Sequence, residues 1–200
     1  MKIIRLKKPE NDYSSNVYYI LGDWNTLEDV NTLIDVGVND FIIKEMEEIN
    51  HGVGKHKVEQ IILTHDHFDH SAGLKYLIKK YNPNVIYAFS DRIPNSTKIS
   101  DGMRVRIGEA DAFIYYSPGH SNDSISVFIP KVKALFSGDT LIAINNPNGS
   151  YTRAYYETIK KYISLSPAII YPGHGEPIVQ NVEQILKYTR QNIEKSKIID

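Results

Sequence analysis

Four apolar segments of the chain are each followed directly by histidine or aspartate. VEQIIL (58–63) leads into THDHFDH (64–70), so that three histidines and two aspartates fall within six residues. The other three segments turn at a glycine just before the polar residue: YYSPGHS (115–121), ALFSGDT (134–140) and IIYPGHGEP (169–177). Imidazole nitrogens and carboxylate oxygens are ligands for zinc, iron and manganese. The repeated pattern therefore predicts a metal site assembled from the ends of several buried strands.

The spacing inside THDHFDH favours two adjacent metal positions over one. His65 and His67 point the same way only where the backbone is extended, whereas Asp69 and His70 need a turn to reach a second position. A strand that ends in a loop supplies both geometries. Asp66 lies between the first two histidines and is expected to face the other way, in a structural or orienting role.

The remaining apolar patterns predict a protein in which strands and helices alternate. We expect strands at 2–6, 16–21, 31–36, 58–64, 85–89, 103–108, 112–117, 124–130, 133–138 and 168–173. Helical spacing of apolar residues predicts helices at 39–50, 71–81, 151–165 and 182–197, with Asn39 or Asp40 available as a cap. The chain thus contains a series of strands with a helix, and roughly the same series is repeated once. This order is typical of an α/β protein with sheets inside and helices outside.

The composition excludes several classes of function. The chain has 200 residues, a formal net charge of -1 and no cysteine. Its length suits a single domain, and the charge gives no electrostatic footprint for nucleic acid or an anionic membrane. Without cysteine there is no disulfide, thiolate metal site or cysteine nucleophile. The first residues, MKIIRLKKPEND, do not form a signal peptide, and no apolar run reaches membrane-spanning length, so we expect a cytoplasmic protein.

The motifs HDHFDH, SPGHS, SGDT and YPGHG resemble those of the metallo-β-lactamase-fold hydrolases in order and approximate spacing. With NVYYILGD and LIDVG near the start, the resemblance covers nearly the whole chain. It implies one domain over residues 1–200 with an α/β fold, a four-layered αββα sandwich of two mixed β-sheets flanked by helices. The metals of the family lie at the edge where the two sheets meet.

The resemblance also assigns ligands. It implies that His65, His67 and His120 hold one cation, that Asp69, His70 and His174 hold a second, and that Asp139 bridges the two. We expect two divalent cations, zinc first, with iron or manganese as alternatives. Asp35, in LIDVG, falls where the family has an aspartate that orients a ligand. His51 and His56 match no ligand of the family and are expected to be solvated.

The expected chemistry is hydrolysis by a water activated between two metals. Asp69 and Asp139 would stay ionised and accept a hydrogen bond from this nucleophile. The true β-lactamases of the fold commonly use a cysteine at the second metal, which this chain lacks, so the glyoxalase II, lactonase and small thioesterase-like members are closer. No dedicated general acid is visible, which favours a thioester or lactone because a thiolate leaves without one. Loops 22–26 and 141–156, the latter with Arg153, are expected to contact the substrate.

Two alternatives remain at this stage. A mononuclear iron oxygenase of the persulfide dioxygenase type would need only His65, His120 and Asp139. A nuclease is a weaker alternative, because the nucleases of this fold usually add a second domain or an arm. Full-length glyoxalase II enzymes carry a helical C-terminal extension, whereas 26 residues follow His174 here, which leaves room for one helix. We expect a small-molecule substrate, no nucleic-acid or membrane partner, and a monomer or homodimer.

Overall fold

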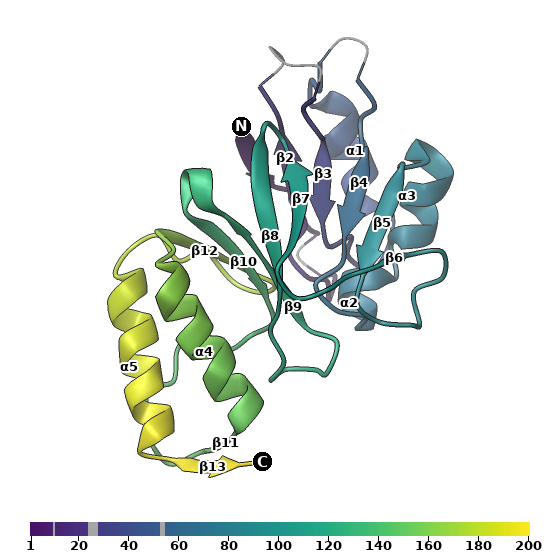
Figure 1. Ribbon diagram of the computed structural model, residues 1–200. Coiled ribbons are helices and arrows are strands. Elements are labelled where there is room, and N and C mark those ends of the chain that lie inside the picture. The colour runs from purple at the N-terminus through teal and green to yellow at the C-terminus, as the bar shows by residue number, and fades with distance from the viewer. Residues whose placement is uncertain (10, 24–27, 53–54) are drawn as a thin grey trace.

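The computed structural model describes residues 1–9, 11–23, 28–52 and 55–200, whose strands form two large sheets and one small sheet (Figure 1). The first sheet has the order β1 (Lys2–Arg5), β2 (Tyr18–Leu21), β3 (Thr32–Ile34), β4 (Gln60–Ile62), β5 (Val85–Ala88) and β6 (Thr97–Lys98). The second has the order β12 (Ile169–Pro172), β10 (Ala134–Gly138), β9 (Ile125–Ile129), β8 (Ala110–Tyr116) and β7 (Met103–Ile107). The small sheet pairs β11 (Ser150–Thr152) with β13 (Lys197–Ile199).

Both large sheets are mixed, and helices lie in the connections of every parallel pair except β5–β6, which residues 89–96 join without a helix. β1, β2 and β3 pair antiparallel, whereas β3, β4, β5 and β6 run parallel. The crossovers contain α1 (Phe41–Glu48) and then α2 (Phe68–Ser71) with α3 (Leu74–Tyr81). In the second sheet, α4 (Arg153–Leu165) lies between the parallel strands β10 and β12, and α5 (Val182–Glu194) follows. Parallel strands require such long connections.

Alternation along the strands produces three apolar layers. In β2, Tyr19 packs with Ile42 and Met46 of α1 in one cluster, whereas Tyr18 and Ile20 belong to a second cluster between the sheets. In the second sheet the same period places Phe136 between the sheets. Leu135 faces the other way, toward the third cluster with Ile159 and Leu186 of the helices α4 and α5. Successive side chains of a strand point to opposite faces, so the four layers αββα of the sequence prediction are confirmed.

The short elements differ from the prediction. The helix after the histidine cluster begins inside it, because His67 is extended and the next residues form α2, separated from α3 at Ala72–Gly73. The strands β6, β11 and β13 lack the apolar alternation that predicts a strand, since most of their residues are exposed. Only Asn39, not Asp40, places a side-chain oxygen on the first turn of α1, where Oδ1 accepts from the amide of Phe41 at 2.9 Å. Among the described residues, no helix combines the length and apolar character needed to cross a bilayer.

Candidate metal centre

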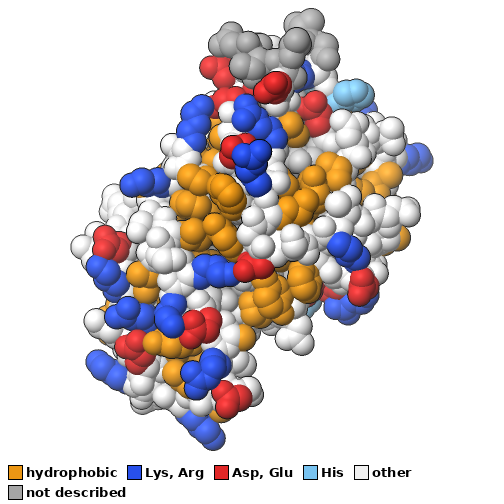
Figure 2. Space-filling view, viewed as in Figure 1, with side chains coloured by type: hydrophobic (Ala, Val, Ile, Leu, Met, Phe, Trp, Pro, Cys, Tyr) orange, Lys and Arg blue, Asp and Glu red, His pale blue; other side chains and the backbone are white. Residues whose placement is uncertain are grey.

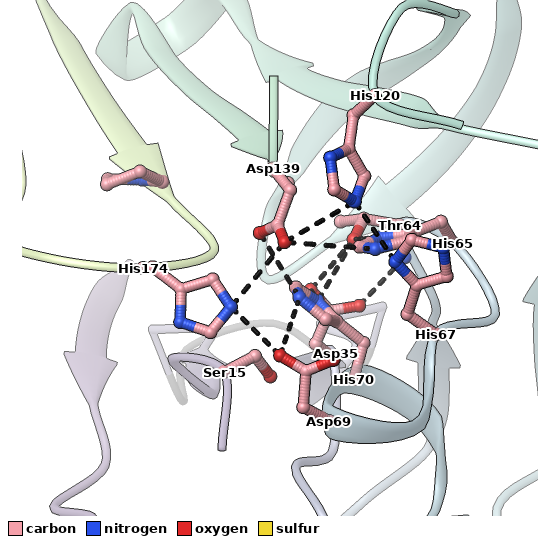
Figure 3. Close-up of polar contacts among 12 residues, drawn as sticks. Ser15, Asp35, Thr64, His65, His67, Asp69, His70, His120, Asp139 and His174 are labelled. Atoms are coloured by element: carbon pink, nitrogen blue, oxygen red, sulfur yellow. Dashed lines mark hydrogen bonds and ion pairs between the residues drawn. The ribbon is translucent and has the colours of Figure 1, made fainter. Parts of the chain in front are cut away.

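The candidate site lies where the two large sheets present the ends of their strands (Figures 1 and 3). Asp35 follows β3, residues 64–70 follow β4, His120 follows β8, Asp139 follows β10 and His174 follows β12. Two contacts hold these ends together. The amide of Ile125 donates to the carbonyl of Thr64 at 2.8 Å, and the amide of Gly173 donates to the carbonyl of Gly138 at 2.8 Å.

The seven residues named from the sequence form two adjacent groups. In the first group, His65, His67 and His120 each bring a ring nitrogen within 4.8 Å of the others. In the second group, Asp69, His70, Asp139 and His174 do the same with one nitrogen or carboxylate oxygen each. Residues more than a hundred positions apart in the sequence therefore meet in one place.

Asp139 lies between the two groups. Its Oδ1 is 3.1 Å from Nε2 of His70, in the second group. Its Oδ2 is 3.6 Å from Nε2 of His120 and 3.9 Å from Nε2 of His65, in the first group. One carboxylate thus faces both groups at once, which is the arrangement that a bridging ligand requires.

Buried polar atoms without hydrogen-bond partners test whether this centre suits a cation. Among the described side chains, His65 Nε2, His70 Nε2 and Asp139 Oδ1 are buried and have no hydrogen-bond partner. Leaving such atoms unsatisfied costs roughly 1–3 kcal/mol each. All three face the space between the groups (Figure 3), and nitrogen with carboxylate oxygen is the donor set of zinc, iron and manganese. The residues present therefore fit a divalent cation.

Asp35 and Thr64 orient two of the histidines. Asp35 accepts from the amide of Thr64 at 2.8 Å and from its hydroxyl at 2.9 Å, and it lies 2.8 Å from Nδ1 of His70. Because the carboxylate only accepts, Nδ1 of His70 carries a proton, and in the neutral imidazole, the form that binds a metal, Nε2 keeps its lone pair. The hydroxyl of Thr64 donates to Asp35, so Nδ1 of His65, 3.1 Å away, must also be the donor. Both Nε2 atoms are thereby left free to bind a cation.

Charge is concentrated in the second group. Burial alone would lower the pKa of His70, but the carboxylates of Asp35 and Asp139 outweigh it and raise this pKa to about 10. Burial would raise the pKa of Asp139, but the imidazoles of His174 and His70 hold this pKa well below its usual range. Contact with Asp139 also raises the pKa of His174. The carboxylates draw positive charge into this group, and a cation could supply it in place of protons.

The first group is less charged. Burial, together with the neighbouring His70, lowers the pKa of His65 to about 4. Burial also lowers the pKa of His120. These two imidazoles are neutral near pH 7, which is the form that binds a metal.

Glycine is required where two strand ends approach most closely. A side chain at Gly173 would place Cβ 2.1 Å from Oδ1 of Asp139 and 2.7 Å from Cε1 of His70. Gly138 adopts φ +52°, and a Cβ there would lie 2.9 Å from Cβ and Oγ1 of Thr64. The glycine turns of the sequence pattern thus permit the ligand residues to meet.

Several supporting residues were not identified from the sequence. Asn16 donates from Nδ2 to the carbonyls of Pro172 and Gly175 at 2.9 and 2.8 Å, which fixes the loop that carries His174. Asp123 accepts from the amide of Asp66 at 2.8 Å. The only signal for Asn16 is a polar residue at the start of an apolar strand, and the contacts of Thr64 and Asp123 depend on tertiary structure.

Asp66 faces away from both groups, as expected. Its carboxylate binds Nε and a terminal nitrogen of Arg92 at 2.6 and 2.7 Å, and the hydroxyl of Ser90 also donates to it. His51 and His56 belong to neither group, and His56 is exposed.

The predicted substrate loops lie only partly at the centre. Leu141, Ile142 and Ala143 line a cleft that reaches Asp139. Arg153 forms an ion pair with Asp200 at 3.0 Å and does not line that cleft, contrary to the prediction that it faces the substrate. Gly22 and Asp23 line a separate cleft that contains none of the seven residues, and residues 24–26 of the other predicted loop lie outside the described part of the chain.

Comparison with known proteins identifies the family. The sequence profile of the Metallo-beta-lactamase superfamily matches residues 11–174. A hydroxyacylglutathione hydrolase of Francisella philomiragia is 34% identical over 125 residues, which cover 59% of this chain and 50% of the relative. An atrochrysone carboxyl ACP thioesterase of Aspergillus fumigatus is 29% identical over 134 residues, which cover 65% of this chain and 42% of the relative. The chain thus spans about half the length of the curated relatives it matches.

A solved structure shows the same fold. The crystal structure of ETHE1 from Myxococcus xanthus superposes with a TM-score of 0.69 at 19% identity, covering 96% of this chain and 88% of that one. The chain therefore belongs to the metallo-β-lactamase superfamily, as the sequence resemblance implied.

Proposed function

We propose that this chain is a metal-dependent hydrolase that cleaves a small-molecule thioester, with a lactone as the second possibility. The convergence of the buried, unpartnered atoms His65 Nε2, His70 Nε2 and Asp139 Oδ1 carries the proposal. The two curated relatives are named as thioester-related enzymes, which supports the choice of substrate. In this proposal residues 1–200 act as one domain.

The proposed ligands are the seven residues of the two groups. His65, His67 and His120 would hold one cation, Asp69, His70 and His174 a second, and Asp139 both. Two divalent cations, zinc first, would supply an activated water and polarise the substrate carbonyl. Asp69 and Asp139 would accept a hydrogen bond from that water, because their carboxylates lie between the imidazoles at 2.9–3.9 Å.

The surroundings of the centre favour a good leaving group. Of the described side chains that line the adjoining cleft, Glu176 is the one acid outside the proposed ligands, and it pairs with Arg5 at 2.8 Å. It is therefore not poised to protonate a leaving amine. A thiolate leaves without this help, whereas an amide nitrogen must be protonated. A hydroxyacyl thioester of the glyoxalase II type is one specific candidate.

A nucleic-acid substrate finds less support. On the face shown in Figure 2, lysine and arginine side chains are interspersed with aspartate and glutamate and form no continuous stripe. The formal net charge of -1 gives no general attraction to a polyanion.

A substrate panel tests the proposal. The purified protein is stripped of metal, reloaded with zinc, manganese or iron, and assayed with thioesters, lactones and phosphodiesters. We expect thioester turnover that requires metal and is lost in His65→Ala and Asp139→Ala, with the circular dichroism of the fold retained. Absence of turnover on every thioester and lactone, or full activity in either variant, would contradict the proposal.

The iron oxygenase is a second candidate, because Asp139 Oδ2 lies within 3.9 Å of a nitrogen of both His65 and His120. Two histidines and one carboxylate suit a single non-haem iron. Protein purified from its native source with one iron per chain and oxygen-dependent turnover of a persulfide would favour this function over the hydrolase.

A further inference from the structure

Two clefts open beside the candidate metal centre. The larger, of about 460 Å³, is lined by Leu141, Ile142, Ala143 and Ile178 and reaches His120, Asp139 and His174. The smaller, of about 180 Å³, shares Leu141, His120 and Asp139 and is closed by Tyr151 and Tyr155. We call the residues 141–143 with Ile178 the acyl wall. A substrate whose carbonyl lies at the centre would extend along this wall.

Apart from the proposed ligands and Glu176, the lining of the clefts is mostly apolar. None of the described residues that line either cleft is lysine or arginine. The hydroxyl of Tyr155 already donates to the carbonyl of Leu141, and that of Thr140 accepts from Tyr162 at 3.1 Å. An anionic group in the larger cleft would find no lysine or arginine to pair with and would lie near Glu176, which is unfavourable.

Leu141 is an exposed apolar side chain beside the centre. It follows Asp139 by two residues, lines both clefts and is 57% exposed. Exposed apolar surface rimmed by polar groups is found at ligand-binding grooves. The apolar side chains of Leu141 and Ile178 beside a carboxylate centre fit a molecule with a polar reactive end and an apolar tail.

We propose that the substrate is a thioester with an extended, uncharged, apolar acyl chain that lies against the acyl wall. This inference rests on the proposed thioester hydrolase function and narrows it away from small hydroxyacyl groups. In the reaction, water forms the new C–O bond to the carbonyl carbon and the C–S bond breaks. The products are the carboxylate of the chain, the free thiol and one proton.

A chain-length series tests the inference directly. Thioesters of one small uncharged thiol, N-acetylcysteamine, are prepared with straight acyl chains of two to ten carbons and with a lactoyl group. A fully buried methylene is worth about a fourfold change, so we expect kcat/KM to rise roughly two- to fourfold per added methylene over the first several carbons. The kcat/KM of the lactoyl thioester should not exceed that of the propionyl thioester. If thioesters are hydrolysed but the profile is flat or falls with length, the inference is wrong. If no thioester is hydrolysed, the proposed function fails instead.

Variants of the wall provide a second test. Leu141→Ser removes apolar surface from a side chain that is largely exposed, and Ala143→Trp fills the cleft. We expect each variant to lower the ratio of kcat/KM for the decanoyl over the acetyl thioester by about tenfold, which corresponds to the contact of about two to three methylenes. The matched control is Val132→Ser, an exposed apolar residue in the turn at the opposite end of β10, which should leave the ratio unchanged. An unchanged ratio in both wall variants would refute the assignment.

A binding measurement removes the dependence on turnover. The metal-free protein with ¹³C-labelled methyl groups is titrated with octanamide, an uncharged mimic of the chain. We expect the methyl resonances of Leu141, Ile142 and Ile178 to shift in a saturable manner while those of Val132 stay constant. No shift at the wall up to the solubility limit of octanamide, or equal shifts at Val132, would contradict the proposal.

Discussion

Asp35→Asn tests most sharply whether Asp35 orients His70 of the second group. Asparagine has nearly the same shape, and it tolerates the positive φ of +57° found at this position. Its side-chain oxygen can still accept from the amide of Thr64. Its NH₂ must then take the place of the oxygen that lies 2.8 Å from Nδ1 of His70. Because NH₂ only donates, His70 must move its proton from Nδ1 to Nε2, the atom that faces the centre.

The size of the effect follows from this change of tautomer. A metal on Nε2 requires the imidazole proton on Nδ1, where the variant offers no acceptor, and it loses the support of the carboxylate. Loss of such a supporting contact typically costs 10- to 100-fold in metal affinity, or about 1.4–2.7 kcal/mol. The metal-free protein should also lose roughly 1.5–3 kcal/mol of unfolding free energy, the usual worth of a hydrogen bond to a charged group.

Zinc competition with a chromophoric chelator measures both binding steps, and urea unfolding measures stability. We expect the variant to lose affinity at the second group by about 10- to 100-fold. The first group should also lose affinity, by a smaller factor, because the Thr64 hydroxyl that orients His65 loses the same acceptor oxygen. Asp111→Asn is the control, since that carboxylate, on β8, is 48% exposed and pairs loosely with Arg104 at 3.5 Å. Two zinc affinities equal to those of the unmodified chain would refute this account of Asp35.

Three further changes probe other parts of the centre. Gly173→Ala should lower zinc affinity at least about tenfold, because its Cβ would lie 2.1 Å from Oδ1 of Asp139 and displace that carboxylate. In the metal-free protein the pKa of His70 is raised from 6.5 to about 10, so its protonated form stabilises the fold fully below pH 6.5. This contribution is lost as the pH rises through 10. Urea unfolding should show that the free energy of unfolding falls by an amount on the order of 2–4 kcal/mol over this range. Arg92→Ala should cost about 1–3 kcal/mol of unfolding free energy, since it leaves the buried carboxylate of Asp66 with Ser90 alone.

Each of these changes has an outcome that would count against it. Unaltered zinc affinity in Gly173→Ala would mean that the strand ends can separate freely. A constant unfolding free energy between pH 6.5 and 10, or the same alkaline slope in Asp35→Asn, would show that His70 is not held as an imidazolium. Arg104→Ala, which breaks an exposed pair at 3.5 Å, is the control for Arg92→Ala and should cost less than about 1 kcal/mol.

The strands that build the centre were predictable because each is an apolar run, and β8, β10 and β12 also end in a glycine turn. Such segments carry two independent signals, a run of apolar residues and a break, and both come from local chemistry. The two faces of β2 and β10 follow from strict alternation, so the layered arrangement was accessible once the strands were known. The strands β6, β11 and β13 carry neither signal, because they are short and mostly exposed.

The contacts within the centre could be predicted from the sequence only in part. That His120, Asp139 and His174 approach His65 could be expected, since each is a metal-binding residue at the end of an apolar strand and the family resemblance implied one shared site. The role of Thr64 could not, because it depends on which way its hydroxyl points relative to Asp35. The prediction that Arg153 contacts the substrate was wrong. This arginine lies in one of the predicted substrate loops but pairs with Asp200 instead.

Anomalous diffraction from crystals soaked in zinc, recorded on both sides of the zinc absorption edge, tests the central claim most directly. The account predicts two zinc peaks per chain, one bound by Nε2 of His65 and the other by Nε2 of His70, with Asp139 contacting both. Peaks confined to other parts of the surface, with the Nε2 atoms of His65 and His70 free of metal at saturating zinc, would contradict it.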